Sequence, residues 1–167
     1  MSAARLLHYH SSPLPPIYSV REQDPYRYKP RGLWVSVEGP DDWLSWCLSE
    51  GFRLENLTHV HAVELAPSAR VLWLRSGACL DDFTEKYGEE HYVAHYRKIM
   101  WEKVALDWHG IVIAPYLWER RMADHTFWYY GWDCASGCIW NVDAIKHVTL
   151  LDVIDDPKLL QFERVAS

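Results

Sequence analysis

The segment from Trp132 to Ser136 places a carboxylate, a thiol and a hydroxyl within five residues. A carboxylate such as Asp133, held beside a bound substrate, can deprotonate an acceptor group. Asp133 could instead be a turn residue that hydrogen-bonds its own backbone, as aspartate commonly does before small residues. The sequence leaves both roles open.

An aromatic run precedes this segment directly, with five large rings among the six residues 127–132. We expect a strand here, on which alternate rings would face opposite sides of a sheet. One face would then line a cleft that receives a flat base. Exposed rings could equally form a protein-binding patch.

The N-terminal part of the chain is basic although the whole chain is acidic. Residues 1–35 carry five Lys or Arg against two Asp or Glu, a balance of +3, while the remainder totals −9. The segment up to Pro30 is rich in Tyr and Pro, so we expect an irregular loop. Arginine binds phosphate oxygens through its planar fork, so such a loop could hold a phosphorylated ligand. A solvated loop with scattered charges is the alternative.

Cysteine and histidine spacing raises the question of metal and thiol chemistry. Cys134 and Cys138 have three residues between them, and the H-x-H pairs at 8–10 and 59–61 each share one face of an expected strand. No second pair with zinc-site spacing accompanies the cysteines, so we expect half-buried strand histidines and no metal. A nucleophilic Cys134 would need a nearby cation or helix N-terminus, and its sequence neighbours supply neither.

Hydrophobic patterning predicts the elements that would position these residues. Expected strands are 5–10, 32–37, 59–65, 71–74, 110–114, 127–132, 137–141 and 148–150. Expected helices are 43–51, capped by Asp41 or Asp42 and ended at Gly51, then 79–87 and 92–108. Strands outnumber helices and interleave irregularly with them, which predicts an α+β fold.

Four segments in chain order resemble the ADP-ribosyltransferase family, and together they cover most of the chain. Residues 9–13, YHSSP, resemble the family's first-strand His-Gly-Ser/Thr motif, and residues 32–36, GLWVS, are similar to its second strand. Residues 108–113, WHGIVI, resemble its Tyr-Asp-Gly-Ile-hydrophobic strand. Residues 136–145, SGCIWNVDAI, resemble its Glu-Tyr-Val-Val-Phe-Asp-Pro-x-x-Ile motif near the C-terminus.

The resemblance implies a single-domain split β-sandwich with a few short helices that binds NAD in a cleft. The family reaction breaks the bond between nicotinamide and ribose through an oxocarbenium-like transition state. His10 would hold the ribose, and Trp34 would stack beside nicotinamide where the family usually has Tyr. The NAD-binding residues expected are His10, Ser12, Lys29, Arg31, Trp34, Ser36 and Trp132, with Lys29 or Arg31 on the pyrophosphate.

The sequence departs from the family at the catalytic end. Ser136 stands where the family has its catalytic Glu, and a serine cannot carry the charge that stabilises an oxocarbenium ion. We therefore expect Asp133, the nearest carboxylate, to act with Ser136 as the catalytic pair. The expected function is transfer of ADP-ribose from NAD to a protein or nucleic-acid acceptor. The alternative is a catalytically silent nucleotide- or protein-binding module, of the kind found in phage and bacterial conflict systems.

The composition and length of the chain limit the classes of protein to which it can belong. A net charge of −6 over 167 residues argues against a protein that coats nucleic acid through bulk charge. The length suits one domain, 1–167, with the basic loop inside 1–31 and a C-terminal tail at 151–167. The four cysteines are too scattered for a disulfide framework, and the sequence contains no run of about 20 apolar residues. We expect a cytoplasmic protein that binds no membrane.

Overall fold

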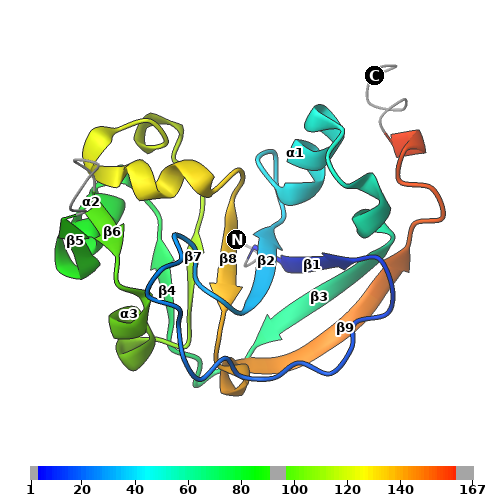
Figure 1. The fold of residues 1–167 in the computed structure, drawn as a ribbon. Coiled ribbons are helices and arrows are strands. Elements are labelled where there is room, and N and C mark those ends of the chain that lie inside the picture. Colours follow the sequence, from blue (N-terminus) through cyan, green and yellow to red (C-terminus); the bar gives the residue numbers. More distant parts are fainter. Residues whose placement is uncertain (1–3, 91–96, 161–167) are drawn as a thin grey trace.

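A seven-stranded mixed sheet forms the centre of the computed structural model, which describes residues 4–90 and 97–160 (Figure 1). Its strand order is β4-β7-β8-β2-β1-β3-β9. The strands are β1 (Leu6–His10), β2 (Leu33–Val37), β3 (His59–Leu65), β4 (Val71–Leu74), β7 (Gly110–Ile113), β8 (Ser136–Ile139) and β9 (Ile145–Val153). A separate antiparallel pair is formed by β5 (Gly88–Glu90) and β6 (Arg97–Ile99).

The sheet divides into two halves that are joined at one end of its central strands. β1 and β2 pair only at Leu6↔Val37 and Leu7↔Ser36. Beyond this point β1 stays with β3 as far as His10, whereas β2 stays with β8. Figure 1 shows the consequence: β7, β8 and β2 run roughly upright, while β1 runs almost horizontally and β3 and β9 slope across the view. The sheet therefore opens between β1 and β2.

Three α-helices and four short 3-10 helices flank the strands in the described residues. They are α1 (Trp43–Glu50), α2 (Gly77–Tyr87), α3 (Trp101–Asp107), η1 (Leu54–Leu57), η2 (Trp118–Arg120), η3 (Asp124–Gly131) and η4 (Val142–Ala144). Asp42 begins α1 by accepting the Ser45 backbone N–H at 2.8 Å, and Gly51 ends it in the left-handed conformation. No helix in the described ranges has both the length and the hydropathy needed to cross a membrane.

Two hydrophobic clusters stabilise the fold. The larger cluster lies around β7, β8 and α2 and includes the buried rings of Phe83, Trp101, Trp128 and Trp132. The smaller cluster lies under α1 and η1 and is centred on Cys47, Leu48, Leu54 and Leu57. The aromatic content of the chain therefore serves mainly as core packing, because a tryptophan or tyrosine buries about 150–250 Å².

The N-terminal segment between β1 and β2 contains no helix or strand, as expected. It is held in place by specific hydrogen bonds: the Val20 N–H donates to the Trp140 carbonyl at 2.8 Å. The Gln23 side chain also donates to the Arg31 carbonyl at 2.9 Å and accepts from the Arg31 N–H at 2.8 Å. The segment thus carries its basic residues at fixed positions on the body of the domain.

The structure confirms the α+β class and most of the expected elements, with three corrections. Residues 127–132 are not a strand, because η3 spans most of them. The helix expected over 92–108 begins only at Trp101, and Arg97–Ile99 is strand β6; residues 91–96 lie outside the described residues. The tail expected from 151 is in part strand, since β9 continues to Val153.

Candidate functional site

A cavity of about 360 Å³ lies where β1 and β2 separate. The strands β1, β2 and β8 provide its floor. The segment 43–56 contributes one part of the wall, and Lys29 with residues 132–134 contributes another. The lining residues are Leu7, His8, Tyr9, Lys29, Trp34, Val35, Ser36, Trp43, Phe52, Arg53, Asn56, Trp132, Asp133, Cys134 and Ser136. In Figure 1, α1 and the η3 segment stand on either side of the upper ends of β8 and β2.

His8 occupies the opening between the two central strands. If the β1–β2 register continued, Tyr9 would face Trp34; instead the His8 side chain contacts the Trp34 carbonyl, with Nδ1 2.7 Å from the oxygen. A carbonyl only accepts, so Nδ1 carries the proton and Nε2 is an acceptor. Burial lowers the pKa of His8 and keeps the ring neutral. Among the described residues, the buried Nε2 has no hydrogen-bond partner.

Two tryptophans form an aromatic wall beside His8. The rings of Trp34 and Trp132 meet edge to face with centroids 4.9 Å apart. The Lys29 ammonium lies 5.3 Å from the centroid of the Trp34 ring, within cation–π range. Trp132 is fully buried, yet its Nε1–H has no acceptor within the described part of the chain. Two buried polar atoms, His8 Nε2 and Trp132 Nε1, thus lack hydrogen-bond partners among the described residues.

Asp133 is the carboxylate among the lining residues. One oxygen lies 3.8 Å from the Arg121 guanidinium, and both side chains are about one-quarter exposed. Partial burial raises the pKa of Asp133, while the positive charges of Lys29 and Arg121 oppose that rise. A carboxylate in this setting can stabilise positive charge that develops on a bound ligand, because screening by water is reduced there.

Ser36 and Ser136 are paired across β2 and β8, and both hydroxyls are engaged with the backbone. Ser36 Oγ accepts the Trp43 N–H at 2.8 Å and so fixes the start of α1. Ser136 Oγ donates to the Cys134 carbonyl at 3.0 Å. Both residues line the cavity, but their hydroxyls are hydrogen-bonded to the backbone that forms its floor and wall.

Three of the expected NAD-binding residues are not among the lining residues. His10 turns back onto the loop, where the Ser12 N–H donates to its Nδ1 at 3.2 Å. Arg31 lies beside Gln23, which binds its backbone. The cavity brings together Lys29, Trp34, Ser36, Trp132, Asp133 and Ser136, and it leaves His10, Ser12 and Arg31 outside its lining.

Sequence reasoning missed His8 and the contribution of the α1–η1 segment. His8 and His10 share one face of β1, so the H-x-H pattern identified the face and did not identify which histidine lies nearer the centre of the sheet. On the other wall, the rings of Trp43 and Trp46 stack with centroids 5.0 Å apart, and Phe52 meets Trp46 edge to face. The sequence signal for this part of the cavity wall is the pair of tryptophans in the helix expected at 43–51.

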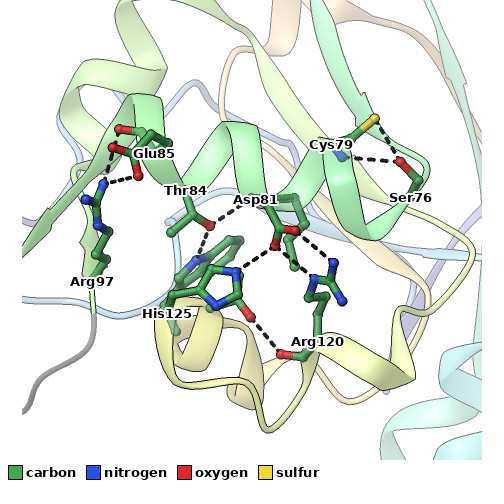
Figure 2. A network of polar contacts seen from close by, with 11 residues as sticks. Ser76, Cys79, Asp81, Thr84, Glu85, Arg97, Arg120 and His125 are labelled. Carbon is green, nitrogen blue, oxygen red and sulfur yellow. Dashed lines mark hydrogen bonds and ion pairs between the residues drawn. The ribbon is translucent and has the colours of Figure 1, made fainter.

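A polar network positions the wall that carries Asp133. Figure 2 shows Asp81 of α2 between Arg120 and His125. The guanidinium of Arg120 donates to the two carboxylate oxygens at 2.9 and 2.8 Å, and His125 Nε2 lies 2.8 Å from one of them. Trp128 Nε1 also donates to Thr84 Oγ1 at 2.9 Å, so η3 is held on α2 at both its polar and its aromatic face.

Among the described residues, the cysteines and histidines do not assemble into another type of site. Burial raises the pKa of Cys134 to about 12 and also raises that of Cys138, so both remain thiols at neutral pH. The ring of His8 is 6.1 Å from that of His10 and 6.3 Å from that of His61. In the part of the chain that the structure describes, no three His, Cys, Asp or Glu side chains are arranged to hold a metal ion.

Comparison with known proteins adds no family assignment, since no protein-family model, curated protein or solved structure matches this chain. The function is therefore argued from the cavity itself.

Proposed function

We propose that this chain is a NAD-dependent mono-ADP-ribosyltransferase-like enzyme of the split β-sandwich type. It transfers ADP-ribose from NAD to a macromolecular acceptor and releases nicotinamide. The observation that carries the proposal is the separation of β1 from β2, which opens a cavity lined by His8, Trp34 and Asp133. These three residues bring a histidine, a flat ring and a carboxylate around one space, and of them Trp34 lies in a segment of the four-segment resemblance.

The lining residues fit NAD by size and by chemistry. The cavity volume of about 360 Å³ falls within the range of about 300–1,000 Å³ typical of small-molecule sites. The indole of Trp34 offers a flat surface for nicotinamide. Asp133 adds a partly exposed carboxylate to the same lining.

The reaction requires stabilisation of positive charge on the ribose. The C–N bond to nicotinamide breaks, and its electron pair leaves with nicotinamide as a neutral molecule. The ribose C1′ then bears oxocarbenium character until the acceptor attacks it, and the acceptor loses a proton to a base. Asp133 supplies the negative charge beside C1′, because Ser136 at the expected glutamate position cannot.

Nicotinamide release tests the proposal. The purified protein is incubated with NAD, with and without cell extract as a source of acceptor, and free nicotinamide is measured. We expect release that Asp133→Asn reduces by at least about 100-fold. Trp34→Ala should abolish NAD binding while the protein remains folded. The matched control is Asp143→Asn, at an exposed position outside the cavity lining. No release with any extract would contradict the enzyme proposal.

The presence of Ser136 at the glutamate position supports one alternative, a catalytically silent module that binds a nucleotide or a partner protein. On this alternative, NAD or another nucleotide raises the unfolding temperature, and no nicotinamide forms. Unchanged properties in Asp133→Asn would favour the silent module, because the enzyme proposal depends on that carboxylate.

A further inference from the structure

A strained arginine stands at the rim of the cavity. Arg53 adopts φ 44° and ψ 45°, the left-handed conformation, and it is the one non-glycine residue with positive φ among those described. Glycine tolerates this conformation without cost, and asparagine adopts it far more often than arginine. Two residues earlier, Gly51 adopts a similar conformation, with φ 63°. Strained backbone of this kind occurs preferentially where a side chain is needed for function.

The side chain of Arg53 packs on an aromatic ring and has no carboxylate partner among the described residues. Its guanidinium carbon lies 5.2 Å from the centroid of the Phe52 ring, so the planar group is supported by an aromatic surface. Both residues line the cavity. Within residues 4–90 and 97–160, Arg53 forms no ion pair with a carboxylate, unlike Arg5, Arg97 and Arg120. An arginine held in place without a carboxylate partner is suited to an anionic ligand.

Resting on the proposed function, we propose that Arg53 binds the pyrophosphate of the dinucleotide. The planar guanidinium matches two phosphate oxygens at once, whereas an ammonium contributes a point charge. Arg31, the sequence-based candidate for this role beside Lys29, is outside the cavity lining. The nicotinamide and its ribose then lie against Trp34 and Asp133.

Binding measurements with Arg53→Asn, Arg53→Lys and the wild type test this assignment. Asparagine accepts the left-handed conformation and removes the charge, so we expect its unfolding temperature to equal or exceed that of the wild type. The ligands are NAD and ADP, which contain a pyrophosphate, and nicotinamide riboside and adenosine, which do not. Arg53→Asn should weaken NAD and ADP by about tenfold or more and leave the phosphate-free ligands unchanged. Arg53→Lys should recover part of the loss.

Arg75 provides a matched control. Its guanidinium carbon also lies over an aromatic ring, 4.6 Å from the Trp73 centroid, but it does not line the cavity. Arg75→Asn should leave all four affinities unchanged. The inference is wrong if Arg53→Asn weakens all four ligands equally, or if it weakens none of them.

The outcomes also separate this inference from the proposed function. If ADP and inorganic pyrophosphate bind through Arg53 but NAD releases no nicotinamide, the phosphate subsite is supported and the transferase is not. If NAD turns over and Arg53→Asn keeps the wild-type Michaelis constant, the transferase is supported and the subsite is wrong.

Discussion

At the scale of single residues, the four cysteines have very different surroundings. Cys79 is exposed near the start of α2, where Ser76 Oγ lies 3.2 Å from its sulfur and lowers the pKa of the thiol. Burial instead raises the pKa of Cys47 and Cys134 to about 12 and that of Cys138 as well. A thiol reacts as its thiolate, so exposure and pKa both favour Cys79.

We therefore predict that a disulfide reagent such as DTNB labels one thiol of the native protein quickly at pH 8. Denaturation should expose all four thiols that the sequence contains. Cys79→Ser should remove the fast phase, and Cys47→Ser, a change at a buried position, should leave that phase intact. Two or more fast thiols in the wild type would contradict the burial of the other three.

The site residues could be predicted in part. Asp133 and Lys29 are predicted from a carboxylate next to aromatic rings and from a basic loop, and Trp34 from the resemblance of residues 32–36 to the family's second strand. All three line the cavity. His8 and Arg53 were not. His8 belongs to the site because β1 separates from β2 after Leu7. Arg53 belongs to it because of a left-handed backbone conformation, which cannot be predicted from an arginine in the sequence.

At the scale of elements, the alternation of apolar and polar residues predicted most strands correctly. The density of aromatic residues at 127–132 wrongly predicted a strand where the structure has η3. Trp128 and Tyr129 are adjacent and both buried, which a strand with one buried face does not allow. Trp132 is also buried, four residues after Trp128, so the three rings follow a helical spacing. Phe127 and Tyr130 stack on each other with centroids 5.3 Å apart on the exposed side. The spacing of the buried residues therefore distinguishes a helix from a strand in this segment, whereas the β-propensity of its residues does not.

Gly137 of β8 allows its strand to lie close to both neighbouring strands, β2 and β7. It pairs with Val35 of β2 and with Val112 of β7. A Cβ atom there would lie 2.4 Å from the Ile111 carbonyl oxygen and 2.7 Å from Val112 Cγ2. Because the nearest atom belongs to the backbone, a side chain can be accommodated only if β8 moves away from β7.

Gly137→Ala should therefore destabilise the fold by roughly 2–3 kcal/mol. This corresponds to a fall in the unfolding temperature of about 5–10 °C for a chain of this size. The control is Gly131→Ala, where the added Cβ meets only the flexible Lys29 side chain, at 3.1 Å. Differential scanning calorimetry of both variants provides the measurement. Equal unfolding temperatures for the two variants would show that β8 is not held this closely.

At the scale of the whole molecule, the cavity lies between two hydrophobic clusters. The large cluster supports Trp132, and the small one supports the segment that carries Phe52 and Arg53. The sequence could predict the α+β class, because strand and helix patterns are local. It could not predict the point at which the sheet divides, since that depends on pairing between β1 and β2, whose residues are about 30 positions apart in the chain.

The histidines at the division of the sheet link its stability to pH. His8 pairs with His61 across β1 and β3, and His61 is only 4% exposed. The buried His8 Nε2 and His61 Nδ1 have no hydrogen-bond partner within the described residues. Burial lowers the pKa of both residues in the folded protein. In the unfolded chain, each histidine titrates near its ordinary pKa of about 6.5.

Well above pH 6.5 both histidines are neutral in the folded and the unfolded chain, so they impose no penalty on folding there. As the pH falls below about 6.5, the unfolded chain takes up protons that the folded protein excludes, so the free energy of unfolding decreases. The slope contributed by each histidine approaches about 1.4 kcal/mol per pH unit. Paired carboxylates, such as Glu38 beside Arg5, have a lowered pKa and therefore reduce stability only in a more acidic range.

Urea unfolding between pH 5 and 7 measures this slope. His61→Gln should flatten it, because glutamine does not titrate and its side-chain oxygen can still accept the Leu14 N–H, which donates to His61 Nε2 at 3.3 Å in the wild type. His147→Gln, at an exposed position on β9, should leave the slope unchanged. If both variants keep the wild-type slope, the acid sensitivity arises elsewhere. A flatter slope in His61→Gln alone would show that the buried pair of His8 and His61 across β1 and β3 makes the fold sensitive to mild acid.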